Sequence, residues 1–130
     1  MKTSYIDVDK HWGITLCWDY DLSYEEDEHA LWGYMRSFGM TDRNANKALN
    51  ILSNYNTGMC VSNEDVRMSG IFISPATTNS EFWSTAIHEA THAAHAIIDY
   101  YGVEWHGEDE AYLTGFIVKR MVELIGEPCY

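Results

Sequence analysis

The chain has 130 residues, 46% of them hydrophobic, and its 20 acidic and 8 basic side chains give a formal net charge of -12. This length and hydrophobic content suit one packed domain over residues 1–130 and exclude disorder over most of the chain. The negative charge repels phosphate backbones and anionic lipid surfaces, so we expect neither nucleic-acid nor membrane binding.

The cysteines and the first residues favour a cytoplasmic location. Cys17, Cys60 and Cys129 are odd in number and far apart, which is typical of free thiols in a reducing compartment rather than of a disulfide framework. The opening segment MKTSYIDVDKHW lacks the apolar core of a signal peptide. No run approaches the roughly 18 apolar residues of a membrane span.

The first part of the chain predicts two strands and a helix. Residues 3–8 and 13–20 alternate or run in β-branched and aromatic residues, with a turn near Lys10. The acidic stretch DLSYEEDE at 21–28 is expected to open a helix that continues to about Phe38, because acids suit a first helical turn.

The middle of the chain predicts another helix and two more strands. Thr41 offers a cap for a helix over about 42–55. The apolar segments 58–62 and 68–74 indicate strands joined by a polar loop, and Pro75 ends the second of them.

The last part predicts two helices. Residues 78–81, Thr-Asn-Ser-Glu, fit a capping box, so a long helix should cover about 80–101 and end at Gly102. A short loop leads to a final helix over about 108–125. Early strands and late helices, without alternation of strand and helix, favour an α+β fold with a short, mainly antiparallel sheet.

Residues 88–92, His-Glu-Ala-Thr-His, carry the clearest chemical signal. On a helix, positions i and i+4 lie one turn apart on the same face, so the imidazoles of His88 and His92 can converge on one zinc ion at about 2.0–2.1 Å. Glu89 projects about 100° round the helix from His88. In that direction it can hold a water bound to the metal, but it is not well placed to be a ligand itself. This is the HExxH arrangement, with Glu89 as general base.

Two stripes run along the predicted HExxH helix. An apolar stripe at helical spacing consists of Trp83, Ile87, Ala90, Ala94, Ile97 and Tyr101. A polar stripe beside it consists of Thr85, His88, His92, His95 and Asp99. We therefore expect one face of the helix to be buried while the next lines a cleft.

A catalytic zinc site needs a third protein ligand, and several residues are candidates. His95 shares the polar stripe but lies about 10 Å from His88 along the axis, too far for one ion to span easily. His106 sits in a loop, and ligands carried on helices are placed more accurately. The remaining candidates are the acids that open the last helix, Glu108, Asp109 and Glu110.

The faces of the last helix favour Glu108 among these acids. Glu108 leads a row with Ala111 and Gly115, and small residues let two helices approach closely. A carboxylate ligand must come within about 2.0–2.2 Å of the zinc, so this close approach is required. Glu110 leads a row of bulky apolar residues, which suits packing. Asp109 leads a mostly charged row, which suits exposure to solvent. The alternative for Glu108 is an acid that only complements the helix dipole.

HEATH followed by a Glu-bearing helix resembles the zincin metallopeptidases of the gluzincin type, whose third ligand is Glu. The pair EFWSTAIHEATHA and GEDEAYLTGF is more closely similar to small zincin-like proteins of gut Bacteroidetes, their phages and mobile elements, over roughly residues 56–121. The resemblance implies a small zincin-like domain in which His88, His92 and Glu108 bind Zn2+. It makes Glu89 the base of a hydrolase acting on peptides or proteins.

The resemblance also assigns a place to the substrate. It implies that the strand at 71–74 is the edge strand with which an extended substrate pairs. Zincin peptidases use an additional donor to the transition state, and the candidates here are Tyr112, His95 and His106. For Tyr112, packing in the core is the stronger alternative, because tyrosine is amphipathic.

The leading expectation is thus a zinc-dependent, metallopeptidase-like hydrolase. The alternative is a non-catalytic, zinc-containing binding or regulatory module that keeps the zincin scaffold and uses a surface such as the acidic run Asp19–Glu28. A weaker possibility is an acidic mimic of nucleic acid. Glu89 favours the enzyme, because a purely structural zinc site needs no base, whereas the small size of the chain favours the module.

Overall fold

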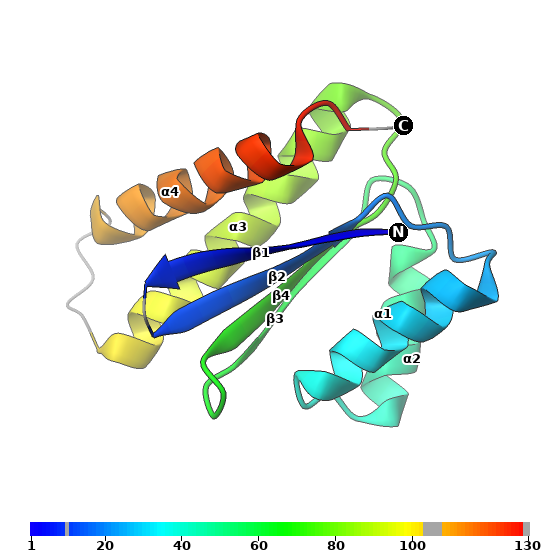
Figure 1. Cartoon of the computed structure of the whole chain (residues 1–130), viewed down its shortest axis with the longest axis horizontal. Helices are drawn as coiled ribbons and strands as arrows, with labels where there is room; N and C mark the ends of the chain where they lie inside the picture. The colour runs from blue at the N-terminus through cyan, green and yellow to red at the C-terminus, as the bar shows by residue number, and fades with distance from the viewer. Residues whose placement is uncertain (10, 103–107, 129–130) are drawn as a thin grey trace.

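The computed structural model describes residues 1–9, 11–102 and 108–128, which form an α+β fold (Figure 1). Its elements agree with the predicted ones apart from shifts at their ends. In chain order they are β1 Lys2–Asp9, β2 Trp12–Trp18, α1 Glu25–Ser37, α2 Asp42–Leu52, β3 Gly58–Asn63, β4 Met68–Ile73, α3 Asn79–Tyr101 and α4 Glu108–Ile125. None of these helices is long and apolar enough to cross a membrane.

The sheet has the strand order β1-β2-β4-β3. β1 pairs with β2 and β3 pairs with β4 in antiparallel fashion, whereas β2 and β4 are parallel neighbours. The sheet is therefore mixed, and the expectation of a mainly antiparallel sheet holds for its two outer pairs. The parallel pair arises because the chain passes through α1, α2 and β3 before it returns beside β2.

Helix pairs cover the two faces of the sheet, α3 and α4 on one and α1 and α2 on the other (Figure 1). Side chains alternate between these faces, as the two-residue period of a strand requires. Leu16 and Ile71 pack in the core beneath α3 and α4. Cys17 and Phe72, their neighbours in the chain, pack in the core beneath α1 and α2.

The strand at 71–74 was expected at the edge of the sheet, and this expectation is wrong. β4 lies inside the sheet, where Ile71 is opposite Leu16 on one side and Cys60 on the other. Both of its hydrogen-bonding edges are therefore occupied, and the edge strand next to α3 is β3. The run MSGIFI is buried almost throughout, as is typical of a central strand.

The caps of α3 confirm the prediction for its two ends. The Thr78 hydroxyl accepts a hydrogen bond from the Glu81 backbone N–H at 3.1 Å, and Gly102 adopts the left-handed conformation with φ of 64°. The predicted apolar stripe is wrong in part, because Ile87 and Tyr101 are exposed. α3 lies against both the sheet and α4, so its buried face is wide and rich in alanine, comprising Phe82, Ala86, Glu89, Ala90, Ala93, Ala94, Ile97 and Ile98.

Candidate metal and catalytic site

His88 and His92 lie one turn apart on the exposed side of α3, and their Nε2 atoms are 3.2 Å apart. Two nitrogens bound at about 2.0–2.1 Å in a tetrahedral zinc site lie about 3.3 Å from each other. The donor pair therefore has the spacing that zinc requires. The same distance also suits a hydrogen bond between the two rings. The assignment of both residues as zinc ligands stays a prediction that this spacing supports.

Glu89 is buried although it carries a carboxylate, with only 6% of its surface exposed. Its Oε1 lies 3.8 Å from Nε2 of His88. Burial raises the pKa of the Glu89 carboxyl, and the nearby His88 and His92 oppose that rise by favouring the charged form. The role of Glu89 as general base stays a prediction, with which its burial and its place beside His88 are compatible.

A cavity of about 430 Å³ opens between the edge strand β3 and α3, and we call it the β3–α3 cleft. It is lined by Gly58, Met59, Cys60 and Ser62 of β3 and by Glu89, His92 and Ala96 of α3. A molecule held in this cleft would contact the candidate base and one candidate ligand together. The cleft is thus built from the HExxH helix and the one strand beside it that has a free edge in the described sheet.

The close approach of β3 to α3 depends on a glycine. A Cβ atom at Gly58 would lie 2.6 Å from Cγ2 of Thr85, 3.0 Å from Cγ of Glu89 and 3.1 Å from the carbonyl oxygen of Phe72. The contact with Thr85 is too short for a real Cβ atom and the other two are tight, so a side chain at residue 58 would push β3 and α3 apart. The composition of the segment did not reveal this role, since any glycine beginning a strand would look the same.

The acids at the start of α4 differ in where they point. Glu108 and Asp109 are exposed. The side chain of Glu110 is 15% exposed, and its Oε1 lies 3.3 Å from Nδ1 of His95 on α3. His106 falls outside the described residues. Within residues 1–9, 11–102 and 108–128, no group of three His, Cys, Asp or Glu side chains is placed to hold a metal ion. The third ligand therefore stays a prediction, and the acid that reaches α3 is Glu110.

The predicted packing face of α4 is wrong. Ala111 and Gly115 are exposed, so the row of small residues does not face α3. Tyr112 on the same side is 75% exposed, which also excludes its packing in the core. The bulky row that follows Glu110 packs instead, consisting of Leu113, Ile117, Met121 and Leu124. Burial of large apolar side chains, each worth roughly 1.5–3 kcal/mol when complete, decides the orientation of the helix.

The thiols of Cys17 and Cys60 are free, as predicted, and Cys129 lies outside the described residues. Burial raises the pKa of Cys17 to about 12. Burial also raises the pKa of Cys60 to about 12, with a further rise from the Glu89 charge and a small opposing effect of a hydrogen bond with Ser62. Both thiols are therefore protonated at neutral pH and are weak nucleophiles.

No family model matches the chain, and neither the curated proteins nor the solved structures contain a match. The residues of the site themselves must therefore support any conclusion about function.

Proposed function

We propose that the protein is a zinc-dependent, metallopeptidase-like hydrolase of the zincin type that acts on a peptide or protein substrate. The observation that carries the proposal is the pair of Nε2 atoms of His88 and His92 at zinc-compatible spacing, with the buried carboxylate of Glu89 beside them. His88 and His92 would hold the ion together with an acid from the start of α4. The sequence favours Glu108 for that place, and the contact with α3 favours Glu110.

The zinc ion and Glu89 would have different roles in the reaction. Zinc, when bound, acts as a Lewis acid that polarises a carbonyl and favours ionisation of water. Glu89 accepts a proton from the attacking water and returns it to the leaving amine, so its charge is restored at the end of the cycle. The low exposure of Glu89 supports this role, because a desolvated carboxylate binds the proton more tightly than one in water.

The free edge of β3 is suited to an extended substrate. In the described sheet β3 pairs only with β4, so its other edge can accept a further strand beside the cleft. The sequence of β3, GMCVSN, contains none of the charged residues or prolines that commonly protect an edge from such pairing. The opposite edge strand, β1, carries Lys2, Asp7 and Asp9 and contacts α4. A strand added to β3 would run along the β3–α3 cleft, which Glu89 lines.

The experiment separates metal binding from chemistry. Zinc-loaded wild type, Glu89→Gln and Glu81→Gln are incubated with a mixed peptide library and a panel of unfolded proteins, and products are identified by mass spectrometry. Glu89→Gln should keep its zinc and lose at least about a hundredfold in rate, the scale for loss of a positioned general base. Glu81→Gln, an exposed acid in the first turn of the same helix, should behave as the wild type.

Cleavage by Glu89→Gln at the wild-type rate would show that the zincin mechanism does not operate. Loss of zinc from the Gln variant would make Glu89 a ligand and remove it as the base. If the zinc-loaded wild type cleaves nothing in the library or the protein panel, the binding or regulatory module replaces the hydrolase as the better description.

A further inference from the structure

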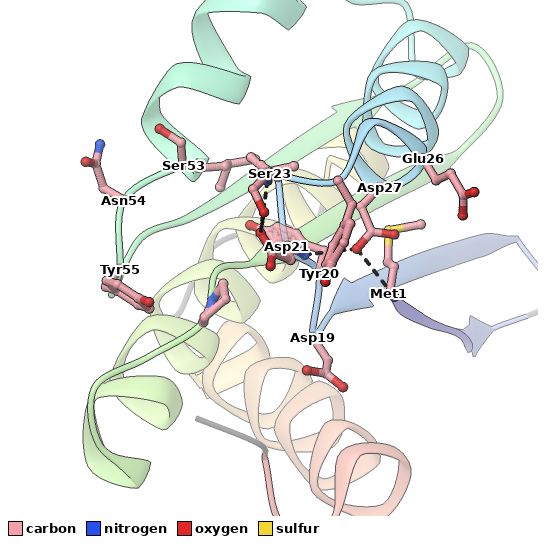
Figure 2. A pocket seen from close by; sticks show the side chains of 14 residues that line it. Met1, Asp19, Tyr20, Asp21, Ser23, Glu26, Asp27, Ser53, Asn54 and Tyr55 are labelled. Atoms are coloured by element: carbon pink, nitrogen blue, oxygen red, sulfur yellow. Dashed lines mark hydrogen bonds and ion pairs between the residues drawn. The ribbon is translucent and has the colours of Figure 1, made fainter.

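A second cavity, of about 860 Å³, lies beyond the ends of β2 and β4 (Figure 2). These strands are parallel neighbours, so their carboxyl ends lie at the same edge of the sheet. From that edge the chain after β2 leads to α1 on one face, and the chain after β4 leads to α3 on the other. Connections that leave to opposite faces open a crevice between them, and open sheets bind ligands in such crevices.

The walls of this strand-end cavity come from separate parts of the chain. Residues 19–24 after β2 form one wall together with the first turn of α1, and residues 52–55 at the end of α2 and Pro75 after β4 form the other. Tyr20 is fixed at its base, because its hydroxyl is 2.9 Å from the Oγ of Ser74, which in turn donates to the carbonyl of Leu52. None of the described residues lines both this cavity and the β3–α3 cleft.

The charge around the strand-end cavity is negative. No Lys, Arg or His side chain is among the described residues that line it, and four carboxylates are, namely Asp19, Asp21, Glu26 and Asp27. Nζ of Lys2 lies 3.6 Å from Oδ2 of Asp19, and the amine nitrogen of Met1 lies 3.6 Å from Oδ2 of Asp27. These two carboxylates therefore have cationic partners. The two other carboxylates leave the cavity with a net negative charge, which favours a cationic ligand over an anionic one.

Asp21 and Glu26 have no cationic partner within the part of the chain that the structure describes. The backbone N–H and the hydroxyl of Ser23 both donate to Oδ1 of Asp21, at 2.9 and 2.6 Å. These hydrogen bonds lower the pKa of Asp21, so its carboxylate is ionised at neutral pH. Figure 2 shows Asp21 near the middle of the cavity lining and Glu26 at one side.

Two tyrosines give the strand-end cavity an aromatic surface. Tyr24 and Tyr55 line it from different segments, and they are 66% and 68% exposed. Large aromatic side chains left uncovered in a concave site offer their faces to a ligand. The face of a tyrosine ring attracts an organic cation, and a nearby carboxylate adds to that attraction.

We propose that the strand-end cavity binds an organic cation, an ammonium or guanidinium group carried by a small amine or by a Lys or Arg side chain of a peptide. Four carboxylates and two exposed tyrosines line the cavity. Separate carboxylates and tyrosine faces suit a larger cation with delocalised or extended charge. The volume of about 860 Å³ falls within the range of small-molecule sites.

Binding is tested on the full chain with two probes, agmatine and a basic peptide with both ends blocked, followed by backbone amide NMR shifts. Saturable shifts are expected at residues 20–24 and 53–55. Glu26→Gln, Asp21→Asn and Tyr55→Ala should each weaken affinity by about two- to fivefold, the range for one exposed charge pair or cation–π contact. Glu25→Gln is the matched control, because Glu25 has the same charge and helical turn but does not line the cavity.

Equal weakening by Glu25→Gln and Glu26→Gln would overturn the proposal, since it would trace binding to the overall negative charge. Absence of saturable shifts at the cavity with both probes, or equal binding of a neutral peptide, would overturn it as well. Binding of both probes supports a small amine, and binding of the peptide alone supports a side chain of a protein partner. Unchanged shifts in His88→Ala would show that this site is independent of the proposed zinc site.

Discussion

Glu108 and Glu110 lie in the first turn of the same helix but have different surroundings. Glu108 is exposed to solvent, whereas Glu110 contacts His95. Zinc affinity is measured by competition with a chelator in Glu108→Ala, Glu110→Ala and the control Asp109→Ala. We expect Glu110→Ala to lower the affinity by at least about tenfold, because the acid of α4 that reaches α3 is lost as a ligand. A larger loss in Glu108→Ala would contradict this and support the sequence-based choice.

Cys17 gives a prediction for alkaline pH. Its pKa is about 12 in the folded protein against an ordinary value of 9.0. The unfolded chain releases the thiol proton above pH 9 while the folded chain retains it, so the free energy of unfolding falls as pH rises from 9 toward 12. At pH 10 the loss should be about 1 kcal/mol.

Urea unfolding of the wild type and Cys17→Ala at pH 7 and pH 10 measures that effect. The fall in the free energy of unfolding between pH 7 and pH 10 should be smaller in the variant. It should not vanish, because burial also raises the pKa of Tyr20 and acts in the same direction. Identical pH dependence in the two proteins would show that the Cys17 thiol does not contribute.

At the scale of elements, β3 and α3 meet through Gly58, whereas Gly115 on α4 has open space around it. Gly58→Ala should destabilise the protein by about 1–3 kcal/mol, because the new methyl group meets Thr85 and backbone. Gly115→Ala, the same change within a helix, should stabilise it by about 1 kcal/mol. Denaturant unfolding checks both values. An unchanged stability in Gly58→Ala would mean that β3 does not lie against α3 as described.

The elements that sequence patterns predicted well are those fixed by local interactions. α3 needs only its own residues to place Thr78 and Gly102 at its ends and the two histidines one turn apart. Strand order depends on pairing between distant segments, so the place of β4 in the sheet was not predictable from its own residues. The orientation of α4 likewise depends on packing between distant segments. The bulky row buries more apolar surface than the small row at Ala111 and Gly115, so the bulky row faces the core.

At the scale of the whole molecule, both cavities depend on topology. The burial of Glu89 requires β3 to lie beside α3, and the strand-end cavity requires β2 and β4 to be parallel neighbours. Neither arrangement appears in a local pattern. The sequence offers the acidic run Asp19–Glu28 as an interaction surface of the alternative module, and only the fold brings part of it together with Tyr55.

Zinc should also stabilise the fold as a whole. An ion that binds the folded chain alone raises the free energy of unfolding by about 2.7 kcal/mol at a free concentration 100 times the Kd. Thermal unfolding with and without added zinc checks this in the wild type and in His92→Ala. A rise in melting temperature should occur in the wild type and be absent in the variant. An equal rise in both would show that zinc binds elsewhere.

The central claim is that His88 and His92 form a zinc site. The protein is purified without a metal-affinity tag or chelator, exposed to zinc, freed of excess, and its metal content per chain is measured. We expect one zinc ion per chain in the wild type and in the control His29→Ala, whose histidine is exposed on α1, and loss of tight binding in His88→Ala and His92→Ala. A wild-type value that stays near zero after zinc is added would contradict the claim.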